Sequence, residues 1–143
     1  MLLLRAREAV MRQFRPMLRE HGVTEQQWRV LRALHAAPAT EITELARATF
    51  LRAPSLSRIL RDLEPRGLVV RRADVNDHRR VRVTLGAAGV TLIDQISPRS
   101  EAIYRDIARR LGGEKFDRLQ DLLRELEAEM LRDAPPEIDD ETS

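Results

Sequence analysis

The 143-residue sequence contains no cysteine, so it cannot form a disulfide, a cysteine-ligated metal site or a thiol nucleophile. Aromatic residues make up only 3% of the chain, which disfavours recognition of RNA by base stacking. No apolar run approaches the roughly 18 residues of a membrane span. Arg5 interrupts the apolar start at residues 1–4, so no signal peptide is expected. These absences predict a cytoplasmic protein without membrane association.

Lysine is nearly absent, since Lys115 is the one lysine among 25 basic residues. The 23 acidic residues bring the net charge to only +2, but the two signs are separated along the chain. Residues 1–82 contain 17 basic and 9 acidic side chains, a net of +8, whereas residues 83–143 contain 8 and 14, a net of −6. This asymmetry predicts that the first segment binds a polyanion and that the second has another role.

The residue types of an active site are also scarce. His21, His35 and His78 lie far apart in the sequence, without the spacing of a metal-binding pair. The chain has neither a glycine-rich phosphate loop nor a nucleophile elbow. We therefore predict no catalytic residue, no metal site and no cofactor, and hence a protein that is not an enzyme.

Two amphipathic helices are predicted at the start of the chain. Apolar residues at steps of three and four indicate the first over residues 2–20, and Pro16 is expected to kink it or end it early. Residues 24–27, Thr-Glu-Gln-Gln, have the pattern of a capping box, which predicts the start of a second helix. Pro38 limits that helix.

A helix-turn-helix is predicted next. A short helix follows Thr40, a turn lies near residues 48–52, and a further helix has Pro54 in its first turn and ends before Gly67. The apolar stripe of that further helix consists of Leu56, Ile59, Leu60 and Leu63. Its opposite face is basic, which favours nucleic-acid binding, although for one helix alone a solvated basic face is the alternative.

The pattern then changes to the alternation that is typical of strands. Residues 68–72 and 80–85 predict two strands, joined by a polar turn at residues 73–78. Five arginines belong to this hairpin: Arg71, Arg72, Arg79, Arg80 and Arg82. Such a cluster repels itself unless an anion compensates it, and DNA phosphate supplies that anion. The predicted fold class is therefore mainly α with a small β-hairpin wing, in the element order of a winged helix-turn-helix.

Two further helices are predicted over residues 87–131, with a bend at residues 97–98 and a break at residues 112–113. The last helix carries a coiled-coil seam of Phe116, Leu119, Leu123, Leu126 and Met130. This seam requires a helical partner, either in a second subunit or within the same one. Residues 133–143 contain five acidic residues, two prolines and no basic residue, which predicts a disordered acidic tail.

Several segments in register resemble the MarR family of transcriptional regulators. They are residues 44–46 (Glu-Leu-Ala), 54–60 (Pro-Ser-Leu-Ser-Arg-Ile-Leu), 63–64, 67–69, 77–80 (Asp-His-Arg-Arg), 83–85 and Gly89. The resemblance extends from the first helix to Met130. Residues 14–22, 24–32 and 96–104 are similar to a subgroup of this family that controls homoprotocatechuate catabolic operons.

The resemblance implies a homodimer that binds double-stranded DNA at a palindromic operator. Residues 1–132 would form a single domain, with a winged helix-turn-helix over residues 38–85 and dimerisation helices over residues 2–21 and 87–131. The predicted dimer contacts are Leu3, Val10, Phe116, Leu119, Leu123, Leu126 and Met130.

The expected DNA-binding residues lie in the helix-turn-helix and the wing. They are Thr40, Thr43, Arg52, Pro54, Ser55, Ser57, Arg58, Arg61, Arg72, Asp77, Arg79 and Arg80. The resemblance implies that Arg79 enters the minor groove and that Asp77 steadies the arginines of the wing; an ordinary turn residue is the alternative for Asp77.

Two positions depart from the family pattern. Gly86 stands where a Thr or Ser often opens the helix after the wing, and Pro65 lies where the recognition helix usually has its last turn. Ala53 is a weak cap before Pro54, so the amides at the start of that helix would stay free for a phosphate.

The resemblance also implies repression that a small phenolic or carboxylated ligand relieves. The candidate effector-binding residues are Arg15, Arg19, His21, Trp28 and Arg32, which offer cations for a carboxylate and a flat wall for a ring. For Trp28 the alternative is a core position, for Arg15 and Arg19 interhelical salt bridges, and for His21 a helix cap.

The absence of cysteine excludes sensing by thiol oxidation. The predicted function is thus a homodimeric repressor of an aromatic catabolic operon. The alternatives are a regulator of the same family that responds to another ligand or acts as an activator, and a winged-helix module for protein interaction.

Overall fold

The computed structural model describes residues 1–136, whose contacts form two compact units. The first unit is Met1–Ile103 and the second begins at Tyr104. In chain order the elements are α1 (Leu2–Glu20), α2 (Glu25–Ala36), β1 (Thr40–Glu41), α3 (Ile42–Thr49), α4 (Ala53–Leu63), β2 (Val69–Ala73), β3 (Val81–Leu85), α5 (Ala87–Leu111) and α6 (Gly113–Leu131). Most of the predicted acidic tail, from residue 137, lies outside the described residues, and the assignment of residues 1–132 to one domain stays a prediction.

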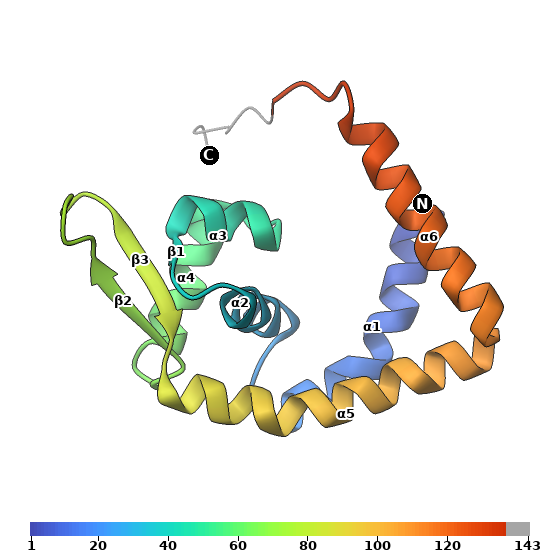
Figure 1. Ribbon diagram of the computed structural model, residues 1–143. Coiled ribbons are helices and arrows are strands. Elements are labelled where there is room, and N and C mark those ends of the chain that lie inside the picture. The colour runs from blue at the N-terminus through green and yellow to red at the C-terminus, as the bar shows by residue number, and fades with distance from the viewer. Residues whose placement is uncertain (137–143) are drawn as a thin grey trace. The chain divides into compact units, whose positions relative to one another are not determined.

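The first helix continues through its proline. Pro16 lies inside α1, which ends only at Glu20, so the expectation of an early end is wrong. Figure 1 shows α1 bent along its length, as the loss of one backbone hydrogen bond allows. Phe14, Met17 and Leu18 are buried, and this burial stabilises the helix around the proline.

The second helix begins as the sequence predicted. The Thr24 hydroxyl accepts a hydrogen bond from the Gln27 amide at 3.1 Å, and the Gln27 side-chain oxygen accepts one from the Thr24 amide at 3.0 Å. The capping box is therefore confirmed. Trp28, Leu31 and Leu34 of α2 are buried in the core of the first unit.

The helix-turn-helix is formed by α3 and α4. Phe50 caps α3 in the left-handed conformation, with φ of 56°. The N-cap of α4 is Arg52 rather than Ala53, so the cap predicted from the sequence is one residue too late. The helix ends at Leu63, two residues before Pro65 and thus before Gly67, as predicted. Leu56, Leu60 and Leu63 are fully buried.

The wing is part of a three-stranded antiparallel sheet of order β1-β3-β2. Strands β2 and β3 pair from Val69 with Leu85 to Ala73 with Val81, which confirms the hairpin within one residue. The edge strand β1 pairs Thr40 with Val83 and was not predicted from the sequence. Figure 1 shows the hairpin beside α3 and α4.

The junction between the wing and α5 explains one departure from the family pattern. A Cβ atom on Gly86 would lie 2.1 Å from the carbonyl oxygen of Gly67, so no side chain fits there. The Gly86 amide donates to the Leu68 carbonyl at 2.9 Å. A Ser or Thr cap at this position would separate the two backbone segments, which is why glycine opens α5.

Candidate nucleic-acid interface

The helix α4 presents one basic face to solvent. Ser55, Arg58 and Arg61 are exposed, on the opposite side from the buried leucines. Arg61 donates through Nε only to the Ser57 carbonyl one turn earlier, at 3.4 Å. The guanidinium groups of this face are therefore available to an anionic ligand.

The N-terminus of α4 offers further donors. Arg52 makes no side-chain hydrogen bond to the helix, and Pro54 occupies its first turn. The first backbone N–H groups of an α-helix lack intrahelical acceptors, and the helix dipole adds positive potential there. This end of α4 can therefore bind a phosphate directly.

The tip of the wing projects an arginine into solvent. Asp77 accepts hydrogen bonds from the Arg79 backbone amide at 3.0 Å and from Arg79 Nε at 3.3 Å. The side chain of Arg79 is nevertheless 93% exposed. Arg80 Nε lies 3.8 Å from the same carboxylate. Asp77 thus holds the turn through the Arg79 amide and contacts both guanidinium groups, while most of the Arg79 side chain stays accessible to a ligand.

The loop end of the hairpin is held by a second carboxylate, Asp74, which follows the last residue of β2. Asp74 accepts a hydrogen bond from the Asn76 amide at 2.8 Å and another from Arg82 Nε at 3.0 Å. The Asn76 amide, followed by Arg82, lowers the pKa of Asp74, and the bond to Asp74 raises the pKa of Arg82. Glu41 on β1 adds ion pairs to Arg80 at 3.4 Å and to Arg82 at 3.7 Å.

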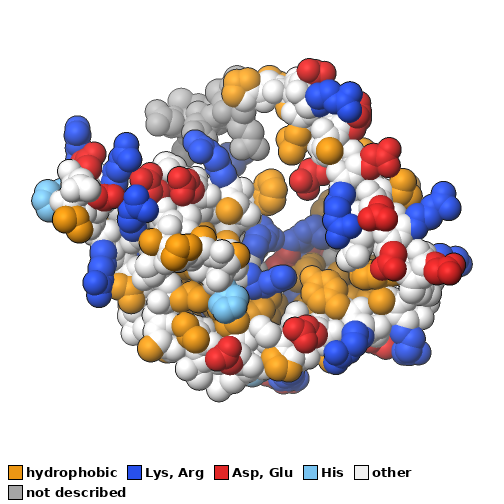
Figure 2. Space-filling model, viewed as in Figure 1, with side chains coloured by type: hydrophobic (Ala, Val, Ile, Leu, Met, Phe, Trp, Pro, Cys, Tyr) orange, Lys and Arg blue, Asp and Glu red, His pale blue; other side chains and the backbone are white. Residues whose placement is uncertain are grey.

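Several arginines of this surface have no acidic partner. Within residues 1–136, no ion pair involves Arg52, Arg58, Arg61 or Arg72, whereas Arg71 is bound by Glu64 at 2.5 Å. Figure 2 shows basic side chains gathered around the hairpin, at the left of the view. The surface of α4 and the wing therefore carries uncompensated positive charge, as a polyanion site requires.

The remaining predicted DNA-binding residues differ in exposure. Thr43 and Pro54 are exposed and Ser57 is half-buried. Thr40 is only 8% exposed, because its backbone lies in β1, and its hydroxyl has no partner among the described residues. Thr40 is therefore the least exposed of the predicted DNA-binding residues, and its contact with DNA stays a prediction.

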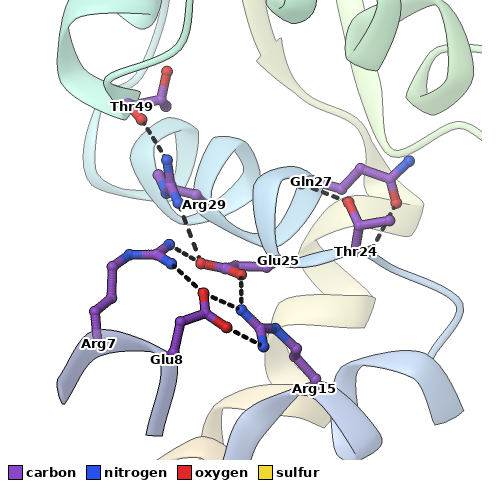
Figure 3. Close-up of polar contacts among 8 residues, drawn as sticks. All are labelled: Arg7, Glu8, Arg15, Thr24, Glu25, Gln27, Arg29 and Thr49. Atoms are coloured by element: carbon purple, nitrogen blue, oxygen red, sulfur yellow. Dashed lines mark hydrogen bonds and ion pairs between the residues drawn. The ribbon is translucent and has the colours of Figure 1, made fainter. Parts of the chain in front are cut away.

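Arg15, a candidate effector-binding residue, is bound to carboxylates. Its guanidinium donates to Glu8 at 3.0 and 2.9 Å and to Glu25 at 3.2 Å (Figure 3). The hydrogen bond with Glu8 raises the pKa of Arg15, and the same bond lowers the pKa of Glu8. Glu8 lies on α1 like Arg15, whereas Glu25 lies on α2, so the contact with Glu25 matches the alternative of a salt bridge between helices.

The other effector candidates lie on two helices. Trp28 is 7% exposed, as the core alternative requires, and Arg32 lies one turn further along α2, exposed. Arg19 is exposed on α1, and His21 Nε2 lies 3.2 Å from an Arg99 nitrogen. Trp28 and Arg32 thus lie one turn apart on α2, whereas the guanidinium of Arg15 is bound by Glu8 and Glu25.

A polar network connects α1 with the turn of the helix-turn-helix. Glu25 binds Arg7, Arg15 and Arg29 (Figure 3). Arg29 also donates to the backbone carbonyl of Thr49 at 3.0 Å, at the end of α3. The sequence predicts the capping box that contains Glu25 and, as one alternative, an interhelical salt bridge for Arg15, but the spacing of Arg7 and Arg29 does not reveal that both also bind Glu25.

The predicted dimer contacts are largely uncovered in the single chain. In α1, Leu3 is 60% exposed and Val10 half-buried. In α6, considered by itself, Leu119, Leu123 and Leu126 are 42–43% exposed and Met130 63% exposed, whereas Phe116 is half-buried. Apolar seams of this kind normally gain their stability by packing against another helix.

Two further findings concern residues 1–136. No helix in this range combines the length and apolarity that a membrane crossing needs. Nor does the described part of the chain bring together three or more acidic or histidine side chains that could hold a metal ion.

Comparison with known proteins gives consistent matches. The model of the MarR family matches residues 21–80. The homoprotocatechuate degradative operon repressor of Escherichia coli is 42% identical over 124 residues, which cover 86% of this chain and 83% of that protein. The crystal structure of NadR in complex with 4-hydroxyphenylacetate is 44% identical, with a TM-score of 0.75, and the match covers 87% and 88% of the two chains. The crystal structure of the transcriptional regulator PA4135 is 40% identical, with a TM-score of 0.86 and 94% and 96% coverage.

Proposed function

We propose, because this chain belongs to the MarR family of transcriptional regulators, that it is a homodimeric repressor of an aromatic catabolic operon. A small phenolic carboxylate releases the repressor from a palindromic operator. The chain acts as a regulator and not as an enzyme, and its site of action is the cytoplasm, where its operator is.

The observation that supports this proposal is the set of exposed arginines on α4 and the wing, several of which have no acidic partner within residues 1–136. They form a positive surface on a winged helix, and a relative that is 42% identical is a repressor. In such a domain the recognition helix reads the major groove while wing arginines enter the minor groove. Arg58 on α4 and Arg79 at the wing tip are the residues we assign to these two contacts.

The DNA assignment is tested by fluorescence anisotropy with duplexes from the region upstream of the gene. Arg58→Ala and Arg79→Ala should each weaken binding by roughly tenfold or more, since a specific arginine contact contributes about 1–3 kcal/mol. Arg118→Ala removes an exposed arginine of α6 and should leave affinity unchanged. Full affinity in both Arg58→Ala and Arg79→Ala would refute the interface.

The effector class rests on a different observation. NadR, 44% identical to this chain, has been crystallised with 4-hydroxyphenylacetate. Trp28 and Arg32 offer a ring wall and a cation one turn apart on α2.

Calorimetry with 4-hydroxyphenylacetate and 3,4-dihydroxyphenylacetate should show binding that Arg32→Ala weakens. The matched control is Gln26→Ala, since Gln26 is an exposed residue of the same helix. The absence of heat with both ligands would refute this effector class without affecting the DNA assignment.

A further inference from the structure

The residue Phe50 lies in an unusual backbone conformation. It is the one non-glycine residue with positive φ, 56°, within the described chain. Its amide donates to the Arg47 carbonyl at 3.3 Å, and the next amide, of Leu51, donates to the Ala46 carbonyl at 3.1 Å. This hydrogen-bond pattern closes a helix at a position that glycine normally occupies.

A phenylalanine at this position has two costs. The left-handed conformation brings its Cβ close to the backbone, a penalty that glycine does not have. The ring is also 84% exposed, so it gains no burial in exchange. Within residues 1–136 the hydrogen bonds of the turn satisfy its backbone, but no side-chain burial offsets the strain at Phe50, which indicates a role for the ring in contact with another molecule.

The surroundings of Phe50 identify the chemistry of that molecule. Arg47 and Arg52, three residues before it and two after, are exposed and have no ion pair within residues 1–136. The open N-terminus of α4 begins at Ala53. An aromatic ring between two unpaired cations and a set of free amides matches duplex DNA, which presents phosphates beside apolar sugar edges and thymine methyl groups.

The turn is also held in place. Arg29 donates to the Thr49 carbonyl at 3.0 Å (Figure 3). The Thr49 hydroxyl donates to the Leu45 carbonyl at 2.6 Å. The backbone directly before the ring is therefore fixed before binding, so little conformational entropy is lost when the ring meets its ligand.

We infer that Phe50 is a DNA-contacting residue whose ring covers an apolar edge of the operator, next to phosphates bound by Arg52 and the start of α4. This inference rests on the proposed function, since it requires that α4 binds DNA. It adds a contact made by the turn between α3 and α4 to the contacts of α4 and the wing. The apolar edge that the ring covers is either a thymine methyl group, which would give a sequence preference, or the adjoining deoxyribose.

The test uses the full chain and a duplex that the wild-type protein selects from random sequences. Three variants separate the ring from the backbone: Phe50→Gly, Phe50→Ala and Phe50→Leu. Phe50→Gly should raise the melting temperature, because the strain disappears, and yet weaken binding about tenfold. Phe50→Ala should weaken binding similarly, whereas Phe50→Leu, which keeps an apolar side chain, should stay within about threefold of the wild type.

Two further measurements identify the contact. Phe50→Gly should leave the slope of log K against log salt unchanged, whereas Arg52→Ala should reduce it by about 0.9, the value of one lost phosphate contact. Replacing the operator thymines one at a time by deoxyuridine should weaken the wild type at a contacted methyl and leave Phe50→Gly unaffected. If no substitution has an effect, the deoxyribose is the contacted edge.

The outcomes distinguish the contact made by Phe50 from the DNA-binding function on which it rests. Wild-type affinity in Phe50→Gly and Phe50→Ala overturns the inference while the DNA-binding function stands. A wild-type protein that selects no duplex overturns both. If Phe50→Gly lowers the melting temperature together with the affinity, the residue serves the fold and the inference fails.

Discussion

Asp74 connects the wing loop to β3 and gives the hairpin a dependence on pH. The Asn76 amide and Arg82 stabilise its charged form, so its pKa is lowered in the folded protein. A group with a lowered folded pKa stabilises the fold above its unfolded pKa, near 3.9, and loses this contribution as the pH falls through the folded value.

Asp74→Asn should therefore melt below the wild type at pH 7, because it lacks the ion pair with Arg82. The difference should shrink as the pH falls below about 4, since the carboxylate of the unfolded wild type then binds a proton before that of the folded protein does. Melting temperatures between pH 7 and pH 3 measure this. Asp94→Asn, on an exposed residue of α5, is the control. A constant difference down to pH 3 would contradict the assignment.

Gly86 and Gly113 offer a matched pair of glycine substitutions. Gly86→Ser should destabilise the fold by roughly 1–3 kcal/mol, because its Cβ would meet the Gly67 carbonyl oxygen at 2.1 Å. Gly113→Ala, with no atom within 4 Å of the added Cβ, should be neutral or slightly stabilising in its helical position. Urea unfolding at equal protein concentration compares the two variants. Equal stability of Gly86→Ser and the wild type would show that α5 can move away from the wing.

At the scale of elements, Arg29 joins α2 to the end of α3. Arg29→Ala should remove a charge-assisted hydrogen bond to the Thr49 carbonyl and raise the exchange rate of the Phe50 and Leu51 amides about fivefold, which corresponds to about 1 kcal/mol. Hydrogen exchange followed by NMR measures this change. Arg12→Ala, on an exposed residue of α1, should leave both amides unchanged. Unchanged exchange in Arg29→Ala would show that the turn does not depend on the network.

The helices and the hairpin could be predicted because their signals are local. The apolar spacing of α1 and α2, the capping box at Thr24, and the alternation of the wing strands all lie within a few neighbouring residues. The strand β1 could not be predicted, since two residues carry no periodicity and Thr40 is a strand residue only through its pairing with Val83. The same distant pairing places Glu41 beside Arg80, which sequence spacing does not reveal.

The sequence predicts which charged residues form the candidate site, but not which ion pairs they make. The arginines of α4 and the wing follow from their density in the sequence. Tertiary contacts, such as those of Glu64 with Arg71 and of Asp74 with Arg82, determine which of these arginines have an acidic partner. Phe50 has no sequence signal, because a residue with positive φ is normally glycine or asparagine.

At the scale of the whole molecule, the exposed apolar seams of α1 and α6 should determine whether the protein forms a dimer. Leu123→Glu places a charge in the middle of the α6 seam and should convert a dimer into a monomer at micromolar concentration. Sedimentation velocity measures the change. Arg118→Glu introduces the same side chain outside the seam, about 140° around α6 from Leu123, and should leave the dimer intact. A monomeric wild type would contradict the homodimer.

The uncrowded glycine that opens α6, Gly113, also has a practical consequence. In Gly113→Cys the added Cβ has no neighbouring atom within 4 Å, and the thiol would be the one cysteine of a protein that otherwise has none. A fluorophore or spin label attached there would report on the long helices from a single known position. Distances between two such labels in an assembled protein could then follow its rearrangement in real time as ligand and operator are added.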